Sequence, residues 1–431
     1  MITARAFSGK HYAVYGLARS GLATLEALLA SGARVTAWDG KEEARAKAPS
    51  GAEIVNLDEA NLSQFDSLVV TPGLPLNRHP IAGRARDAGV EIIGDIELFA
   101  RARPELPPHK VVGITGTNGK STTTALVHHI LKTAGVPSLM GGNIGLPILS
   151  QNPLAPNAKG VGVYVLELSS YQIDLTQNLD CDVAVLLNIT PDHLDRYDSF
   201  EAYEASKLRL FQMQDVGNHL AVLTEPWPVR AVIDEGVPNV NIAWVDAETT
   251  VGGQRNWPAL QGPHNTENAA CAMAVFRELG VSDQIVQEGL RTYPGLPHRM
   301  ERIREKDGVS FVNDSKATNP ASTAPALAAF SAIRWICGGQ AKTDNLDECA
   351  PFFSHVRQAY TIGEASDLFA RLLAPHIKVA ECGDLAHAVF RAAHDAEPGD
   401  TVLLSPACAS FDQFRDFEER GERFRTLLEA L

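Results

Sequence analysis

The stretch that decides the fold reads GITGTNGKST and runs from Gly113 to Thr122. Its first residues complete a predicted strand, "KVVGIT", and its last residues open a helical pattern, "GKSTTTALVHHILKTAG", that ends at Gly135. A glycine-rich turn between a strand and a helix presents backbone N–H groups and a partial positive charge to an anion. The standard phosphate loop would place a glycine at position 114, where this chain has isoleucine. The alternative is a glycine-rich turn before an ordinary helix, but Gly-Lys-Ser-Thr directly after a strand favours a nucleotide site.

The loop residues have separate expected tasks. Lys120 is suited to the β- and γ-phosphates of ATP as a point charge, and Ser121 or Thr122 to a magnesium ion. The predicted ATP contacts in the loop are Gly116, Thr117, Asn118, Gly119, Lys120, Ser121 and Thr122.

Magnesium needs further oxygen ligands, and two neighbouring strands of the predicted sheet end in polar groups. "GVYVLELSSYQ" is a buried strand with Glu167 near its carboxyl end, where a carboxylate is costly unless paired or bound to metal. The next strand, "VAVLLNITPDHLDRY", ends in Asn188, Asp192, His193 and Asp195. Taken alone, His193 or Asp195 is more often a helix-start or loop residue. Beside a phosphate loop, we favour a metal role for Glu167 and His193.

Composition and charge narrow the class of protein. The chain has 431 residues, 45% of them apolar and 21% charged, which suggests about three domains. A formal net charge of −14 disfavours binding to nucleic acid or an anionic membrane. No apolar run reaches the length of a membrane span, and no export signal is visible. The six cysteines stand singly, which predicts a reduced, cytoplasmic protein without cysteine-bound metal.

Strand-like and helix-like stretches alternate along the whole chain, as in "HYAVYGL", "GLATLEALLAS", "RVTAWD" and "SLVVTPG". This alternation predicts an α/β fold with mainly parallel sheets. Proline-rich breaks at "RPELPPHK" and "YPGLPHR" divide it into domains 1–107, 108–297 and 298–431. We expect a Rossmann-like first domain, a central phosphate-loop ATPase domain and a Rossmann-like third domain.

The first domain carries Gly16-x-Ala18-x-x-Gly21 between a strand and a helix, with Asp39 at the end of the next strand. This is nearly the dinucleotide fingerprint, in which glycines admit a pyrophosphate and the acid binds ribose hydroxyls. Ala18 in place of the middle glycine crowds that approach. The pattern therefore leaves open NAD, another pyrophosphate ligand such as a UDP-sugar, or a turn without ligand.

At this point the motifs resemble a known family. "GITGTNGKSTTT", "ELSSYQ", "NITPDHLDRY", "GPHNTENAACA", "GLPHRME", "NDSKATNP" and "LLSPACASFDQF" stand in the order found in the Mur ligases, from about residue 10 to 425. "NDSKATNP" with "SPACASFDQF" is most similar to the members that add D-glutamate to UDP-N-acetylmuramoyl-L-alanine. The resemblance implies ATP-dependent ligation through an acyl phosphate, with two Mg²⁺ ions, in the synthesis of peptidoglycan precursors.

The resemblance also implies roles for residues that match the motifs. Lys120, His193 and Lys207 resemble the catalytic residues, and Lys207 falls where the family carries a carbamylated lysine. The residues that correspond to the metal sites are Ser121, Glu167, His193 and Lys207, and those that correspond to the ATP site outside the loop are Asn268, Arg299 and Asp314. The UDP substrate corresponds to Arg19, Ser20, Asp39, Gly73 and Asn143. D-glutamate corresponds to Lys316, Thr318, Lys342, Ser410 and Phe417. We expect the turn Thr71-Pro72-Gly73 to form a second wall of the UDP site.

Plain alternatives exist for several of these residues. Without the family, Lys207 reads as a solvated surface lysine, Asn268 as a helix cap, Phe417 as core and Arg299 as half of a surface ion pair. His193 or Asp192 is a candidate base for the amine of D-glutamate, and the sequence does not choose between them.

Three other functions compete with ligation of D-glutamate. A folylpolyglutamate synthase shares the central loop but does not need the UDP-type first domain. An NAD(P)-dependent oxidoreductase leaves "GTNGKST" and "NDSKATN" unexplained. A nucleotide-binding regulator does not require Lys316, Lys342 and "SPACASFD".

Overall fold

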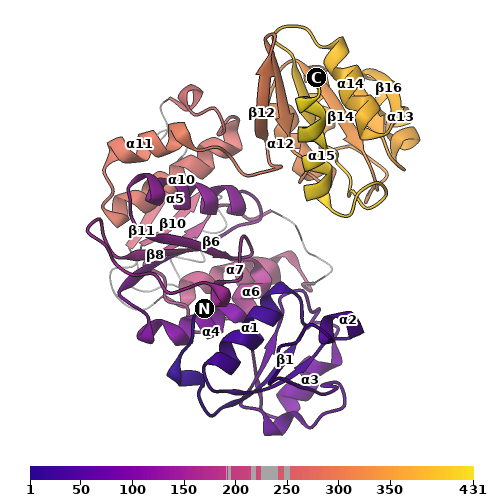
Figure 1. Ribbon diagram of the computed structural model, residues 1–431. Helices are drawn as coiled ribbons and strands as arrows, with labels where there is room; N and C mark the ends of the chain where they lie inside the picture. Colours follow the sequence, from indigo (N-terminus) through magenta and orange to yellow (C-terminus); the bar gives the residue numbers. More distant parts are fainter. Residues whose placement is uncertain (191, 193–195, 215–219, 225–240, 247–252) are drawn as a thin grey trace. The chain divides into compact units, whose positions relative to one another are not determined.

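The computed structural model describes residues 1–431 except 191, 193–195, 215–219, 225–240 and 247–252 (Figure 1). In this described part, three sheets are each flanked by helices, so the fold is the predicted three-domain α/β class. The chain forms two compact units. One contains Met1–Val251 and Glu267–Leu290 and holds the first two sheets; the other contains Gly252–Thr266 and Arg291–Leu431 and holds the third. The domain limits 1–107, 108–297 and 298–431 stay a prediction.

The N-terminal sheet has the strand order β3-β2-β1-β4-β5, and its strands are parallel. Its elements are β1 (His11–Tyr15), α1 (Arg19–Ala30), β2 (Arg34–Trp38), α2 (Glu42–Arg45), β3 (Glu53–Ile54), β4 (Ser67–Val70), α3 (Pro80–Asp87), β5 (Glu91–Ile93) and α4 (Asp95–Ala102). The three apolar stretches predicted as strands are β1, β2 and β4. The central strand β1 pairs Tyr12 with Val35 on one side and Ser67 on the other.

The central sheet has the order β11-β10-β9-β6-β8-β7 and is also parallel. It comprises β6 (His109–Thr115), α5 (Lys120–Thr133), β7 (Ser138–Gly142), β8 (Gly162–Glu167), α6 (Ser170–Asp174), β9 (Val183–Leu186), α7 (Phe200–Gln212), β10 (Leu220–Thr224), β11 (Asn241–Val245), α10 (Pro263–Leu279) and α11 (Asp283–Thr292). We expected the two strands with polar ends, β8 and β9, to be neighbours in the sheet, but they are not adjacent. They lie on either side of β6, so both ends flank the phosphate loop.

The C-terminal sheet has the order β12-β13-β17-β14-β15-β16. Only the edge pair β12–β13 is antiparallel among the described strand pairs of this sheet. Its elements are β12 (Glu301–Lys306), β13 (Val309–Asn313), α12 (Pro320–Ala329), β14 (Ile333–Gly338), β15 (Val356–Ile362), α13 (Ser366–Leu373), β16 (Lys378–Gly383), α14 (Leu385–Asp395), β17 (Thr401–Leu404) and α15 (Phe417–Glu429). The carboxyl ends of β13 and β17 carry the motifs "NDSK" and "SPACAS".

The helices of the described residues include none that is long and apolar enough to cross a lipid bilayer. All six cysteines are free thiols, and only Cys382 is partly exposed.

Candidate functional site

The loop between β6 and α5 is braced by the end of β9. Thr117 N–H donates to the backbone oxygen of Asn188 at 2.8 Å, and Asn118 N–H donates to Asn188 Oδ1 at 2.8 Å. Asn188 Nδ2 returns a bond to the carbonyl of Asn118 at 3.2 Å. Gly119 takes left-handed backbone angles (φ 82°, ψ −16°) and forms the N-cap of α5. The sequence therefore folds into a helix-start loop whose shape is fixed by a neighbouring strand.

Two lysine side chains converge on one carbonyl of this loop. Lys120 Nζ donates to the carbonyl oxygens of Gly116 and Thr117, each at 2.8 Å, and Lys207 Nζ donates to that of Gly116 at 2.9 Å. Lys207 is 1% exposed, which contradicts its reading as a solvated surface residue. Burial, and then the charge of Lys120, lower the pKa of Lys207 to about 6. Its amine is therefore largely uncharged at neutral pH.

Glu167 ends β8 with a buried carboxylate, 2% exposed. Its Oε1 accepts a hydrogen bond from Asn143 Nδ2 at 3.0 Å, whereas its Oε2 has no partner in the described residues. A buried carboxylate oxygen without a donor fits a magnesium ion, which prefers such oxygens. Ser121 is buried in the first turn of α5.

The other predicted metal ligands do not complete this set. An unmodified Lys207 amine offers no oxygen ligand, whereas magnesium prefers oxygen atoms. His193 lies outside the described residues, and Asp192 is exposed. The described chain shows no group of three or more His, Cys, Asp or Glu side chains arranged for a metal.

Asn268 packs against the phosphate loop from α10. Its Oδ1 accepts a bond from Thr123 Oγ1 at 3.2 Å, and a Cβ placed on Gly119 would lie only 2.2 Å from the same oxygen. Asn268 is 3% exposed and lies inside the helix, so it is not the helix cap that the sequence left open.

In the C-terminal unit, Asp314 is held at the end of β13. Its carboxylate accepts bonds from Ser405 Oγ at 2.7 Å and from Met300 N–H at 3.1 Å. Burial raises its pKa to about 7. Arg299 is preceded and followed by residues with left-handed backbone, His298 (φ 60°) and Met300 (φ 48°), a strained arrangement that is common at functional sites. Arg299 Nε is buried and has no partner among the described atoms, which fits an anionic ligand better than a surface ion pair.

The residues predicted for D-glutamate come from "SKAT", the turn after β14, "SPACASFDQF" and the start of α15, where Phe417 is the first residue. Lys342 Nζ donates to Thr318 Oγ1 at 3.4 Å, and Lys316 Nζ lies 5.4 Å from the ring centroid of Phe417. Ser410 is 2% exposed, and its carbonyl accepts the N–H of Phe414 at 2.8 Å. Phe417 is only half-buried and so is not simply a core residue.

Sequence reasoning missed Arg420, which joins these motifs. It is 1% exposed and donates to Ser315 Oγ (3.0 Å), Ser315 O (2.8 Å), Cys408 O (3.0 Å) and Ala409 O (3.2 Å). Burial lowers its pKa to about 10. The pattern "FEERGERF" contains several charged residues of an exposed helix, and nothing in it distinguishes the one that points inward.

In the N-terminal domain, Asp39 braces the glycine turn. Its Oδ2 accepts Leu17 N–H at 2.7 Å and its Oδ1 accepts Lys41 N–H at 2.9 Å. Arg19 Nη2 donates to the carbonyl of Gly145 at 2.5 Å, in the central-domain loop that also carries Asn143. Ser20 is half-buried and Gly73 is exposed.

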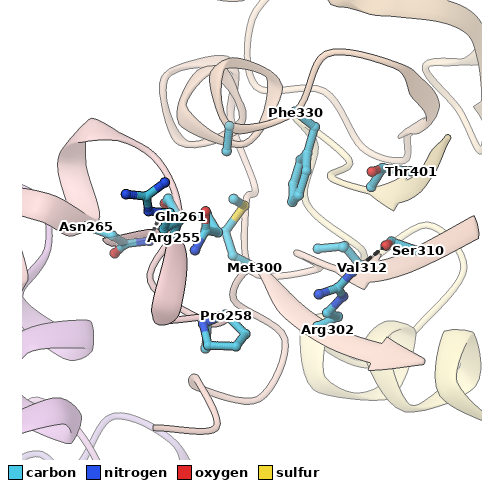
Figure 2. Close-up of a pocket in the computed structure, with 12 residues that line it drawn as sticks. Arg255, Pro258, Gln261, Asn265, Met300, Arg302, Ser310, Val312, Phe330 and Thr401 are labelled. Carbon is cyan, nitrogen blue, oxygen red and sulfur yellow. Dashed lines mark hydrogen bonds between the residues drawn. The ribbon is translucent and has the colours of Figure 1, made fainter. Parts of the chain in front are cut away.

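A cavity of about 340 Å³ lies in the C-terminal unit beside Met300. Figure 2 shows Met300 between Gln261 and Asn265 on one side and Val312 and Arg302 on the other. The cavity lining is Arg255, Pro258, Ala259, Gln261, Asn265, Met300, Arg302, Ser310, Val312, Ala329, Phe330 and Thr401. Half of these twelve residues are apolar and half are polar or charged, and the volume is at the low end of the range for small-molecule sites.

Family models match most of the chain. The Mur ligase MurD-like N-terminal domain matches residues 10–94, the Mur ligase middle domain 114–246, and the Mur ligase glutamate ligase domain 298–408. The UDP-N-acetylmuramoylalanine–D-glutamate ligase of Novosphingobium aromaticivorans is 58% identical over 100% of this chain and 97% of its own length. The ligase of the same name from Sphingopyxis alaskensis is 59% identical over the full length of both. The chain belongs to the Mur ligase family.

Solved structures of Mur ligases share the fold. The MurF ligase from Thermotoga maritima in complex with ADP has a TM-score of 0.59 at 19% identity, covering 98% of this chain and 96% of its own. The folylpolyglutamate synthase/dihydrofolate synthase from Yersinia pestis, complexed with AMPPNP and a manganese ion, has a TM-score of 0.54 at 18% identity and covers 78% of this chain and 93% of its own. At these identities the comparison shows the fold alone.

The predicted site residues of this Mur ligase fall into two sets, each within one compact unit. The first set comprises Arg19, Ser20, Asp39, Gly73, Gly116, Thr117, Asn118, Gly119, Lys120, Ser121, Thr122, Asn143, Glu167, Lys207 and Asn268. The second comprises Arg299, Asp314, Lys316, Thr318, Lys342, Ser410 and Phe417.

Proposed function

We propose that the chain joins D-glutamate to UDP-N-acetylmuramoyl-L-alanine, called the UDP substrate below, with conversion of ATP to ADP and phosphate. The observation that carries this proposal is that ligases of this name match the chain over its whole length, including the first domain. A folylpolyglutamate synthase would not need a MurD-like N-terminal domain, and an oxidoreductase would not need the other two domains. The proposed use of ATP and the free cysteines fit a cytoplasmic reaction.

The proposed chemistry solves a leaving-group problem. A carboxylate does not react with an amine at neutral pH, because oxide or hydroxide would have to leave. In the first step, an oxygen of the L-alanine carboxylate attacks the γ-phosphorus of ATP, and the bond to the β-phosphate oxygen breaks to release ADP. In the second step, the neutral amine of D-glutamate attacks the acyl carbon, and phosphate leaves with the oxygen that came from the carboxylate. The amine proton passes to a base, for which Asp192 and His193 remain candidates.

Both reactants of the first step are anions, so the site must concentrate positive charge. Lys120 and the N-terminus of α5 supply it from the loop. Lys120 now bonds the carbonyls of Gly116 and Thr117, and we propose that phosphate oxygens replace these neutral acceptors when ATP binds. The buried Nε of Arg299 is a further donor without a described partner, and we propose that it contacts the nucleotide phosphates.

Magnesium would be held by Ser121 and Glu167, together with His193 and a carbamylated Lys207, in two sites. When bound, it neutralises phosphate charge and orients the triphosphate. The unpartnered Oε2 of Glu167 supports its part in this set.

Carbamylation of Lys207 follows from its uncharged amine. The lone pair of the neutral amine attacks the carbon of carbon dioxide and a proton is lost to solvent, so that the uncharged amine becomes a carbamate with an anionic oxygen ligand. The pKa of about 6 makes the amine available for this step at neutral pH. We expect wild-type protein equilibrated with ¹³CO₂ to show a carbamate carbon resonance that Lys207→Arg lacks. An identical spectrum for the two proteins would contradict carbamylation at this residue.

The remaining residues bind the three substrates. We propose that Arg19, Ser20, Asp39, Gly73 and Asn143 contact the UDP substrate. Asn268 would lie around the nucleotide and its transferred phosphate, and Asp314 on the ribose side of ATP. D-glutamate would be held by Lys316, Thr318, Lys342, Ser410 and Phe417. Lysine ammonium groups and the buried hydroxyl of Ser410 suit the two carboxylates of that amino acid.

We further propose that the cavity beside Met300 accepts the adenine base (Figure 2). It adjoins the proposed ribose residue, because the backbone N–H of Met300 donates to Asp314. Phe330 and Val312 provide apolar surface, and Asn265 and Gln261 provide polar groups. Ala329→Trp should fill the cavity and weaken ATP binding without changing affinity for the UDP substrate, as measured by calorimetry. Unchanged ATP affinity would place the base elsewhere.

The test of the function is phosphate release from ATP with the UDP substrate and either enantiomer of glutamate. We expect release that requires both the UDP substrate and D-glutamate. Release that depends on a folate and L-glutamate would select the synthase, and a change in NADH absorbance would select the oxidoreductase.

A further inference from the structure

One side chain of the central domain binds the backbone of the N-terminal domain beside the predicted UDP site. Arg196 donates from Nη1 to the carbonyl of Gly73 (3.3 Å) and from Nη2 to the carbonyls of Pro72 (3.3 Å) and Leu74 (2.9 Å). These carbonyls belong to the 71–74 turn, Thr71 to Leu74, which follows β4 and has no regular secondary structure. A single guanidinium thus contacts three successive peptide groups of another domain within the same compact unit.

The position of Arg196 is itself fixed by aromatic rings of the central domain. Its guanidinium carbon lies 4.2 Å from the ring centroid of Tyr171, and the Tyr171 ring stacks on that of Tyr197 with centroids 6.0 Å apart. The Tyr197 hydroxyl donates to Asp174 Oδ2 at 2.8 Å and lies 3.2 Å from Ser206 Oγ. Cation–π contact and these bonds hold the arginine against α6 and α7.

The same aromatic cluster reaches the phosphate loop. The rings of Tyr197 and Tyr203 have centroids 5.4 Å apart, and the Tyr203 hydroxyl lies 3.0 Å from Thr117 Oγ1. Lys207 Nζ lies 4.6 Å from the ring centroid of Tyr203. Contacts therefore run without a gap from the 71–74 turn, through Arg196 and three tyrosines, to the loop and to Lys207.

We propose that Arg196 is a positioning residue that holds the 71–74 turn as a wall of the UDP site and sets its place relative to the phosphate loop. This inference rests on the proposed function. A turn without regular secondary structure can change its conformation unless hydrogen-bond donors bind its carbonyl groups. Arginine suits this task because its planar fork offers several donors in fixed directions, whereas a lysine ammonium serves as a point charge.

The test compares binding of the UDP substrate and of magnesium-ATP to the full chain. In Arg196→Ala we expect affinity for the UDP substrate, measured by calorimetry, to fall on the order of ten- to hundredfold, with KM for that substrate rising in parallel. Affinity for magnesium-ATP and KM for D-glutamate should stay near the wild-type values. Arg196→Lys keeps a cation over Tyr171 and should recover only part of the affinity, which separates loss of the fork from loss of folding.

Arg84→Ala is the matched control. Arg84 also donates to two backbone carbonyls, those of Leu57 and Ala60, but wholly within the N-terminal domain. Its loss should lower stability and leave affinity for the UDP substrate unchanged. If Arg196→Ala keeps the wild-type KM for the UDP substrate, or weakens binding of both substrates equally, Arg196 has no positioning role. A wild-type protein whose phosphate release ignores the UDP substrate would instead contradict the proposed function.

Discussion

Gly119→Ala tests the phosphate loop at a position where the structure leaves no room for a methyl group. Two costs add at this position. A non-glycine residue in the left-handed region costs about 1–2 kcal/mol. The new Cβ would also lie 2.2 Å from Asn268 Oδ1, so the Asn268 amide must move and release Thr123 Oγ1. Loss of that hydrogen bond adds about 0.5–1.5 kcal/mol. We expect a total loss of unfolding free energy of about 1.5–3.5 kcal/mol.

The substitution should also weaken ATP binding, because Asn268 is a proposed nucleotide contact. A displacement that removes one good hydrogen bond to ATP lowers affinity about tenfold. Urea unfolding of the full chain measures the first effect, and calorimetric titration with magnesium-ATP measures the second.

Gly135→Ala provides the control at the other end of the same helix. Gly135 has φ 73°, but the nearest atom to an added Cβ is Lys159 Cγ at 3.4 Å, an ordinary contact. This variant should lose only the backbone term, about 1–2 kcal/mol, and bind ATP as the wild type does. Equal losses of stability in the two variants, with unchanged ATP affinity in both, would refute the reasoning about Asn268.

Three further predictions concern buried charges. Arg420→Met should lose about 2–4 kcal/mol in urea unfolding, because Ser315 O and Cys408 O would lose the Arg420 donors they accept in the structure; wild-type stability would contradict this. The pKa of Asp314 rises from 3.8 to about 7 on folding, so the folded state holds its proton more tightly. Wild-type stability should therefore fall relative to Asp314→Asn as pH rises from about 4 to about 7, and parallel pH profiles would oppose the assignment. The pKa of Lys207 falls from 10.5 to about 6 on folding, so the unfolded state binds the proton more tightly. In CO₂-free buffer the wild type should therefore gain stability relative to Lys207→Met as pH rises above about 6. A difference in stability that does not change with pH would contradict the lowered pKa.

Local patterns were enough to predict the scaffold. Strand, glycine-rich loop and helix are consecutive in the chain, so β6, the loop and α5 follow from sequence spacing and helix-start chemistry. The end of α5 at Thr133, before Gly135 with positive φ, likewise follows from residues nearby in sequence.

Long-range contacts could not be predicted in this way. Lys207 looks like any helix lysine until the fold buries it beside Lys120. Burial, and then the charge of Lys120, lower its pKa, and neither can be seen from its residue type. β6 separates β8 and β9, because strand order depends on crossover connections and not on chain order. Arg196 donates to the carbonyl of Leu74 and Arg420 to that of Ser315, both far away in sequence. Every residue has a backbone carbonyl, so residue types do not reveal such a partner. Family resemblance gave expected roles to Asn268 and Arg299, but it assigned no role to Arg420 or to Arg196, although Arg196 stands in the motif "NITPDHLDRY".

The most direct test of the central claim follows one oxygen atom. If the phosphate loop presents ATP to the carboxylate of the UDP substrate, that carboxylate must lose one oxygen to phosphate. With the UDP substrate labelled with ¹⁸O in the L-alanine carboxylate, and with ATP and D-glutamate added, we predict that mass spectrometry finds one ¹⁸O atom in each phosphate released. Released phosphate that carries no label would contradict activation of the carboxylate by phosphoryl transfer.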